Sequence, residues 1–218
     1  MKYNFLLISL LFFSLHTFAQ KSSSSFHFKN GDLLFQDLDC GPLCNAIESV
    51  TLCYKGMPLS HIAIVEIVNG NIHVIEAIGS NVHKTPIDIF LKRSVDTNGI
   101  PKIIVGKLKP AYKNLLPKAI LFCNKQIGKK YDDMFLPNND KYYCSELLYN
   151  AFKYANKGKV FFALQPMTFK DKITHQYFPV WIDYFAALKI DIPEGIEGCN
   201  PASIANDVKI LIVNTNEK

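Results

Sequence analysis

A cysteine at the start of a predicted helix is the first feature of this sequence that could carry out chemistry. A helical pattern of apolar residues begins at the cysteine and continues to about residue 154 on one face: Cys144, Leu147, Leu148, Ala151, Phe152 and Ala155. In the first turn, free backbone N–H groups and the positive end of the helix dipole favour a thiolate over a thiol. Cys144 is therefore a candidate nucleophile, although a small buried residue under a helix would fit the same pattern.

A histidine and a glutamate are predicted to lie beside each other on one face of a β-hairpin. The hairpin joins strands at 61–68 and 71–78 through Asn69-Gly70, a dipeptide typical of two-residue turns. This register makes His61 and Glu76 diagonal neighbours, roughly 7–8 Å apart along the backbone. A three- or five-residue loop would instead move Glu76 to the other face. A carboxylate that orients an imidazole is half of a catalytic triad, and a buried structural pair is the alternative.

The remaining patterns predict one α+β domain around these residues. Besides the hairpin, we expect strands at 31–35, 100–108 and 208–213, and helices at 42–52, 85–93, 114–127 and 144–154. Thr85-Pro86-Ile87-Asp88 resembles a capping box with proline in the first turn, which is why a helix is expected there. No repeat or low-complexity block divides the chain, so a single domain is the simplest interpretation.

The N-terminus is typical of a secretory signal peptide. A positive start is followed by the apolar run 5–13 and by Thr17-Phe18-Ala19, a small-residue cleavage site. The run is shorter than the about 20 apolar residues that a membrane span needs, so we expect no transmembrane segment in the mature chain. We therefore predict a signal peptide at 1–19, a linker at 20–29, and an exported, periplasmic or extracellular domain at 30–218.

Charge and cysteine content narrow the possible partners and cofactors. The formal net charge is only +5 and the basic residues are scattered, so we expect no nucleic-acid partner. Cys40 and Cys44 are close enough to bridge or to ligate a metal. No second Cys or His pair at zinc-site spacing accompanies them, and we expect neither a metal nor a cofactor. Cys123 lies on the apolar face of a helix, where a position in the core is expected.

Five short motifs occur in an order that resembles a known family. They are Gly31-Asp32-Leu33-Leu34-Phe35, Ser60-His61-Ile62-Ala63-Ile64-Val65, Val74-Ile75-Glu76-Ala77, Ile127-Gly128-Lys129-Lys130-Tyr131-Asp132 and Tyr143-Cys144-Ser145-Glu146-Leu147. Over roughly residues 31–155 the chain resembles the YiiX-like branch of the NlpC-type papain-like hydrolases. That branch is circularly permuted, so its histidine strand precedes its nucleophile helix, as in this chain.

The resemblance implies a permuted papain-like α+β fold, in which an antiparallel sheet packs against helices and the nucleophile lies at a helix N-terminus. It implies that Cys144 is the nucleophile, His61 the general base and Glu76 the third, polar member. Tyr131 matches a tyrosine whose hydroxyl lies near the oxyanion site in NlpC-type enzymes, and Tyr143 is a second candidate for oxyanion or substrate binding. This chain has Tyr-Cys-Ser-Glu where those enzymes commonly have Asp-Cys-Ser-Gly, so their substrate preference does not carry over.

Three functions remain open from the sequence. The first is an exported, monomeric cysteine hydrolase that cleaves an amide in a cell-wall peptide or a related small amide through a thioester. The second is a lipid acyl hydrolase or acyltransferase of the lecithin retinol acyltransferase-like type, because the aromatic stretch 161–185 could line an apolar pocket as well as form core. The third is a non-catalytic ligand-binding module, which would have no need to retain Cys144, His61 and Glu76 together.

Overall fold

The Asn69-Gly70 turn forms the hairpin that positions two of the predicted site residues. Strands β2 (His61–Val68) and β3 (Asn71–Ile78) pair antiparallel, with the last residue of β2 opposite the first of β3. Both turn residues have positive φ, as a two-residue hairpin turn of type I′ requires. The predicted register is confirmed, and it places His61 and Glu76 on the same face of the sheet.

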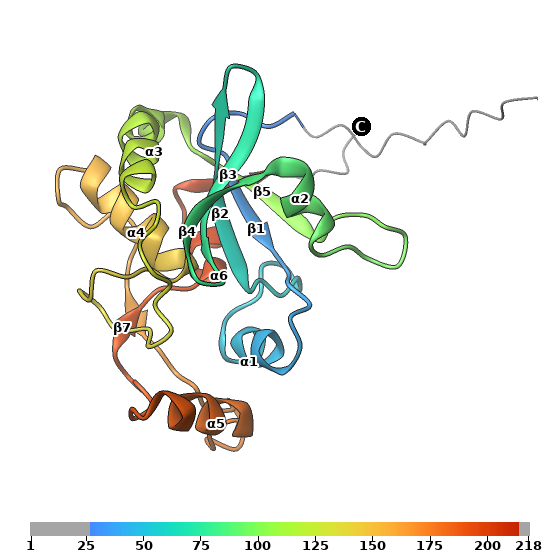
Figure 1. Cartoon of the computed structure of the whole chain (residues 1–218), viewed down its shortest axis with the longest axis vertical. Helices are drawn as coiled ribbons and strands as arrows, with labels where there is room; N and C mark the ends of the chain where they lie inside the picture. The colour runs from blue at the N-terminus through green and yellow to red at the C-terminus, as the bar shows by residue number, and fades with distance from the viewer. Residues whose placement is uncertain (1–26, 214–218) are drawn as a thin grey trace, which may run out of the picture.

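The hairpin belongs to a six-stranded antiparallel sheet with the order β4-β3-β2-β1-β5-β8 (Figure 1). The computed structural model describes residues 27–213. The other strands of this sheet are β1 (Leu33–Gln36), β4 (Asn81–Pro86), β5 (Ile103–Leu108) and β8 (Ile210–Val213), and a two-stranded sheet is formed by β6 (Gln165–Pro166) and β7 (Glu197–Gly198). The expected strands are therefore present with small changes in their ends, while β4 was not expected.

Strand β4 also overturns the predicted helix cap. Helix α2 (Ile87–Lys92) begins after Pro86, and no side chain caps it. Thr85 lies in β4, and its hydroxyl donates to Glu76 at 2.5 Å instead of to the helix backbone. The capping-box prediction is wrong because a residue before proline is restricted to extended backbone, which suits the end of a strand.

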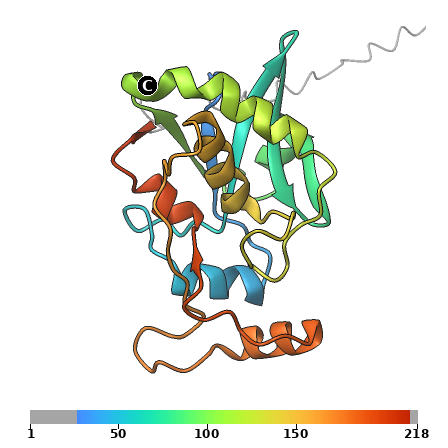
Figure 2. The same cartoon turned by 90° about the vertical axis from the view of Figure 1, so that its left-hand side faces the viewer.

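Helices cover both faces of the large sheet (Figures 1 and 2). They are α1 (Pro42–Val50), α2, the 3-10 helix η1 (Pro110–Leu115), α3 (Leu116–Lys125), α4 (Cys144–Ala155), α5 (Pro179–Leu188) and α6 (Pro201–Ala205). The main core lies between the sheet and α4, where Leu147 and Leu148 share a cluster with Ile62 and Ile64. Phe90 of α2 packs on the opposite face. Side chains on opposite faces of the sheet can therefore approach each other where β2 and α4 begin.

The aromatic stretch 161–185 divides between two cores. Phe161 and Phe162 pack into the main core, where they stack on Phe152 of α4 or contact its edge. Phe169, Trp181 and Phe185 form a separate cluster with Ala46 of α1. Figure 1 shows α1 and α5 on the same side of the molecule, below the sheet. The second cluster thus joins α1 to α5 apart from the main core.

The cysteines and the termini complete the comparison with the sequence. Cys40 and Cys44 form a disulfide at the start of α1, and Cys123 is fully buried in the core as predicted. Within residues 27–213, no helix is both long and apolar enough to cross a membrane. The signal peptide predicted at 1–19, and most of the linker predicted at 20–29, lie outside the described residues.

Candidate active site

His61 and Glu76 are in direct contact in the buried interior. The His61 Nε2 atom lies 2.6 Å from Glu76 Oε2, and the two residues are 2% and 0% exposed. Continuing the β2–β3 ladder by one step beyond the Ile64–Ile75 pair sets Ala63 opposite Glu76, so His61 is the diagonal neighbour that the turn predicted. The hairpin therefore brings a carboxylate onto one nitrogen of the imidazole.

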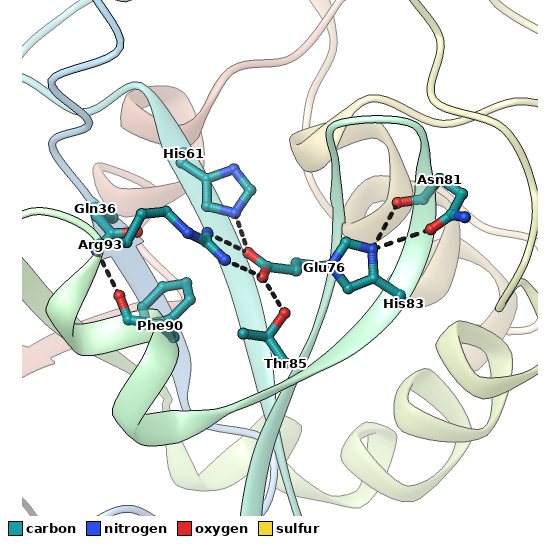
Figure 3. A network of polar contacts seen from close by, with 8 residues as sticks. All are labelled: Gln36, His61, Glu76, Asn81, His83, Thr85, Phe90 and Arg93. Atoms are coloured by element: carbon teal, nitrogen blue, oxygen red, sulfur yellow. Dashed lines mark hydrogen bonds and ion pairs between the residues drawn. The ribbon is translucent and has the colours of Figure 1, made fainter.

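Two further residues, which the sequence analysis did not identify, donate hydrogen bonds to the Glu76 carboxylate (Figure 3). The Arg93 guanidinium donates to both carboxylate oxygens, at 2.9 Å from Nη1 to Oε2 and 2.6 Å from Nη2 to Oε1. The Thr85 hydroxyl donates to Oε1 at 2.5 Å. A fork of this kind fixes the plane of a carboxylate as well as its charge. Glu76 is therefore held from three sides, by His61, Arg93 and Thr85.

These contacts decide the charge of Glu76. Burial alone would raise the pKa of this carboxyl, but the hydrogen bonds from Arg93 and His61 and their positive charges hold that pKa well below its usual range. Glu76 is thus an anion at neutral pH although it is fully buried. A buried carboxylate stays ionised only when it is paired and hydrogen-bonded in this way.

Helix α2 is itself fixed against the site. The Gln36 side chain of β1 donates to the Phe90 carbonyl at 3.0 Å, and Gln36 pairs with His61 across the β1–β2 ladder. The Arg93 guanidinium lies over the Phe90 ring, 5.3 Å from its centroid, and the His61 ring is 6.2 Å from the same ring. Helix α2, which ends just before Arg93, is therefore fixed to the strand that pairs with His61.

Cys144 and His61 interact at the other end of this array. Cys144 is the first residue of α4, as predicted, and is 6% exposed. Burial would lower the pKa of His61, but hydrogen bonds with Cys144 and Glu76, together with their negative charges, raise it to about 9. Figure 3 shows the second ring nitrogen of His61 pointing away from Glu76. The imidazole thus stands between Cys144 and Glu76 and is charged at neutral pH.

Both predicted tyrosines line the cavity onto which Cys144 opens. Burial, and then the electrostatic influence of Cys144, raises the pKa of Tyr131 well above its usual value, so this hydroxyl stays protonated and can donate. The Tyr143 hydroxyl, whose pKa is also raised by burial, accepts a hydrogen bond from the Cys199 backbone N–H at 3.2 Å. Tyr143 therefore joins the start of α4 to the chain near β7, and a role for either tyrosine in oxyanion binding remains a prediction.

The cavity beside Cys144 has a volume of about 310 Å³. Its walls come from α1 and the residues that follow it, from the chain around β6, from α5 and from the start of α4. The apolar members include Ile47, Val50, Leu52, Met167, Phe169 and Trp181. None of the described residues that line it is an Asp, Glu, Lys, Arg or His. The site therefore has a charged side at His61 and Glu76 and an uncharged side in this cavity.

Within residues 27–213, no group of three or more His, Cys, Asp or Glu side chains is arranged to hold a metal ion. Cys40 and Cys44, which from the sequence could either bridge or ligate a metal, form a disulfide.

A family model matches this chain, and a solved structure is similar to it. Residues 27–214 match the family described as "Permuted papain-like amidase enzyme, YaeF/YiiX, C92 family". A solved structure, described as the crystal structure of metalloprotein YiiX from Escherichia coli O157:H7, is similar with a TM-score of 0.65 and 21% sequence identity. The similarity covers 85% of this chain and 96% of that chain. No curated protein sequence matches the chain.

Proposed function

The chain belongs to the C92 family of permuted papain-like amidases, and from this premise we propose that it is an exported cysteine amidase with Cys144 as nucleophile. The family also confirms the α+β, permuted papain-like fold that the order of the motifs predicted. The observation that carries the proposal is the unbroken series of interactions from Cys144 through His61 to Glu76. A thiol hydrolase needs these three groups in this order.

The proposed reaction proceeds through a thioester. The Cys144 thiolate attacks the carbonyl carbon of the amide and forms a tetrahedral oxyanion, which the Tyr131 hydroxyl and a backbone N–H at the start of α4 stabilise. The His61 imidazolium then gives its proton to the leaving nitrogen, so the C–N bond breaks and an amine leaves. In the second half, His61 takes a proton from water, which attacks the thioester and releases a carboxylic acid and the Cys144 thiolate.

Glu76 supports both halves of this reaction through its contact with Nε2. The carboxylate fixes the orientation of the ring and stabilises the imidazolium, as the acidic member of a triad does. Because Arg93 and Thr85 keep Glu76 ionised and fixed, the negative charge is present before the substrate binds. A buried set of charges of this size is costly unless it serves a function, which disfavours a non-catalytic binding module.

The proposed place of action is the cell envelope. A signal peptide at the N-terminus would carry the domain out of the cytoplasm, and the disulfide between Cys40 and Cys44 suits an oxidising compartment. The proposed substrate is an amide found there, in a cell-wall peptide or a related small molecule, and the proposed form of the enzyme is a monomer.

The test compares Cys144→Ala with Cys53→Ala on a panel of cell-wall peptides and N-acyl amides. Cys53 is a free, exposed cysteine that does not line the cavity, so its replacement is the matched control. We expect Cys144→Ala to lose activity by about a thousandfold or more, and Cys53→Ala to lose almost none. Intact mass after rapid acid quench should show an acyl group on the wild-type and Cys53→Ala proteins and none on Cys144→Ala. Full activity of Cys144→Ala would overturn the proposal.

A further inference from the structure

Lysines that are scattered along the sequence gather on one side of the folded chain, where η1 and α3 lie beside the C-terminal end of α4. Within residues 27–213, six of them form no ion pair, and together they define what we call the basic face: Lys109, Lys113, Lys118, Lys125, Lys157 and Lys159. We propose that the basic face docks on the surface of an anionic phospholipid membrane. This inference goes beyond the proposed amidase activity and does not depend on it.

Contacts between η1, α3 and α4 join these lysines into one surface. Helix α3 packs along α4, and the Lys125 ammonium lies 6.0 Å from the centroid of the Tyr154 ring near the end of α4. Lys118 and Lys125 are two helical turns apart, so they point to the same side of α3. The Tyr112 ring of η1 meets the Phe161 ring edge-on at 5.4 Å, which brings η1 to the segment that follows α4. Figure 2 shows α3 running across the upper part of the molecule next to α4.

Negative charge is absent from the segments that build this surface. Residues 97–131 contain eight lysines and no Asp or Glu, and residues 147–170 contain four lysines and no Asp or Glu. Acids on neighbouring elements are paired with other lysines, namely Asp207 with Lys209, Asp32 with Lys107 and Glu66 with Lys84. The basic face therefore carries positive charge that no carboxylate of these elements neutralises. A surface of lipid phosphates is its electrostatic complement.

Exposed apolar side chains among the lysines favour a membrane over a soluble polyanion. Leu121 lies on the lysine-bearing side of α3 and is 47% exposed. Tyr154 is 45% exposed, and Val160, next to Lys159, is 60% exposed. Lysines interspersed with apolar and aromatic residues suit the membrane interface, where the apolar groups leave water and the ammonium groups reach the headgroups. A soluble polyanion would contact the lysines and leave the apolar groups in water.

Docking through the basic face leaves the catalytic cavity uncovered. Figure 1 shows α3 in the upper part of the molecule and α1 and α5 at its lower end. The cavity beside Cys144 has its walls mainly in α1, in the chain around β6 and in α5. The docked protein would therefore present Cys144 to the aqueous compartment instead of to the membrane.

Flotation of the whole protein with lipid vesicles tests the proposal. Vesicles of phosphatidylcholine with about a quarter phosphatidylglycerol should bind the protein about tenfold or more tightly than vesicles of phosphatidylcholine alone. The difference should disappear in about 1 M salt, where the Debye length is only about 3 Å.

Two pairs of substitutions locate the docking surface. Lys118→Gln with Lys125→Gln should weaken binding to the anionic vesicles by about fivefold for each charge removed. Lys55→Gln with Lys189→Gln removes the same charge from exposed residues outside the basic face, so it should change binding by less than about twofold. Equal losses in the two pairs would show that net charge alone attracts the protein, and would overturn the proposal.

Leu121→Gln separates a membrane from a soluble polyanion. Glutamine suits a helix nearly as well as leucine, so α3 is preserved and only apolar area is lost. We expect binding to anionic vesicles to weaken by about threefold and binding to inorganic polyphosphate to stay the same.

Two results would contradict the membrane as partner. One is a failure to float with anionic vesicles at low salt. The other is binding to polyphosphate as tight as to vesicles, with no effect of Leu121→Gln on either, which would identify a soluble polyanion instead. None of these measurements depends on catalysis, so a negative result leaves the proposed amidase activity untouched.

Discussion

The two sides of Cys144 are built on opposite physical principles. On one side, His61, Glu76 and Arg93 form an array of alternating charge, in which the carboxylate has defined hydrogen-bond partners at 2.5–2.9 Å. On the other side, a cavity of about 310 Å³ has no Asp, Glu, Lys, Arg or His among its described lining. The first side comes from β2, β3, β4 and α2, and the second mainly from α1 and α5. Reactivity and substrate selection are therefore assigned to separate elements of the chain.

This difference has a consequence for substitutions. Groups in the array depend on one another, because each charge is stabilised in the buried interior only by its neighbours. Residues of the cavity contribute by burying apolar area, and each substitution there removes a small part of that area, nearly independently of the others. Substitutions in the array should change kcat and the pH profile, whereas substitutions in the cavity should change the preference among substrates.

The largest effect is expected for Glu76→Gln. The amide keeps the shape of the side chain but removes the charge that stabilises the His61 imidazolium, and it leaves Arg93 without its anion. We expect kcat/KM to fall by about a hundredfold to ten-thousandfold, as in triads that lose their acidic member. The measurement is steady-state kinetics on one amide substrate at neutral pH. A loss of less than about threefold would show that the array does not support the reaction.

Glu66→Gln is the matched control for this prediction. Glu66 is a buried glutamate of the same hairpin, but it lies on the other face of the sheet, where the Asn124 amide donates to it at 2.6 Å and Lys84 forms an ion pair. His73 lies opposite Glu66 in the β2–β3 ladder, and Asn124 of α3 covers this carboxylate. Its substitution should lower the free energy of unfolding and leave kcat unchanged.

A smaller loss of activity is expected for Arg93→Met. Removing the guanidinium leaves a fully buried carboxylate with one cation fewer, so the pKa of Glu76 should rise from its depressed position. We expect kcat to fall by about tenfold to a hundredfold, and the acid limb of the pH profile to move to higher pH. Arg93→Lys, which keeps the charge without the fork, should recover part of the activity.

Two measurements show whether Arg93 acts through Glu76. Lys92→Met removes a neighbouring, exposed cation whose ion pair within residues 27–213 is with Asp88, and it should change neither kcat nor the pH profile. In a Glu76→Gln background, Arg93→Met should cost much less than it does alone, because its partner is already lost. Losses that simply add in the double variant would contradict the proposed dependence.

The pH dependence of the wild-type protein follows from the raised pKa of His61, about 9 against a usual value of 6.5. The imidazolium that protonates the leaving amine is lost as pH rises through about 9, so the rate should fall above that pH by about tenfold per unit. The free energy of unfolding should also fall as pH rises. A raised histidine pKa contributes stabilisation that is complete below 6.5 and disappears between there and about 9. Denaturant titrations across this range should show the decline in wild type and a weaker decline in Glu76→Gln.

Half of the array was predictable because its geometry is local. A two-residue Asn69-Gly70 turn permits one register, and that register brings His61 to Glu76 without information from the rest of the chain. The start of α4 was equally local, since the apolar period begins at Cys144. In both cases a backbone rule acting over a few residues fixed the position of a functional side chain.

Arg93, Thr85 and the cavity were not predictable in the same way. Thr85-Pro86 fits a strand end and a helix cap equally well in sequence, and only the pairing of β4 with β3 distinguishes them. Arg93 reaches Glu76 because α2 folds back over the sheet, which no local pattern specifies. The cavity walls include Ile47 and Trp181, which lie far apart in the sequence, and an aromatic residue of the core has the same sequence signature as one that lines a pocket.

The smallest effect, and the sharpest contrast with the array, is expected for Leu52→Ala. This side chain lines the cavity but is already 57% exposed, so truncation removes little buried apolar area. We expect KM for long-chain acyl amides to rise by about twofold to threefold, with a smaller change for acetyl amides. The pH profile should not move, because the Lys172 ammonium, which donates to the carbonyl of the preceding residue Thr51, is not part of the array of His61, Glu76 and Arg93. A shift of the alkaline limb in Leu52→Ala would show that the cavity and the array are coupled, and that selection and reactivity are not separate in this enzyme.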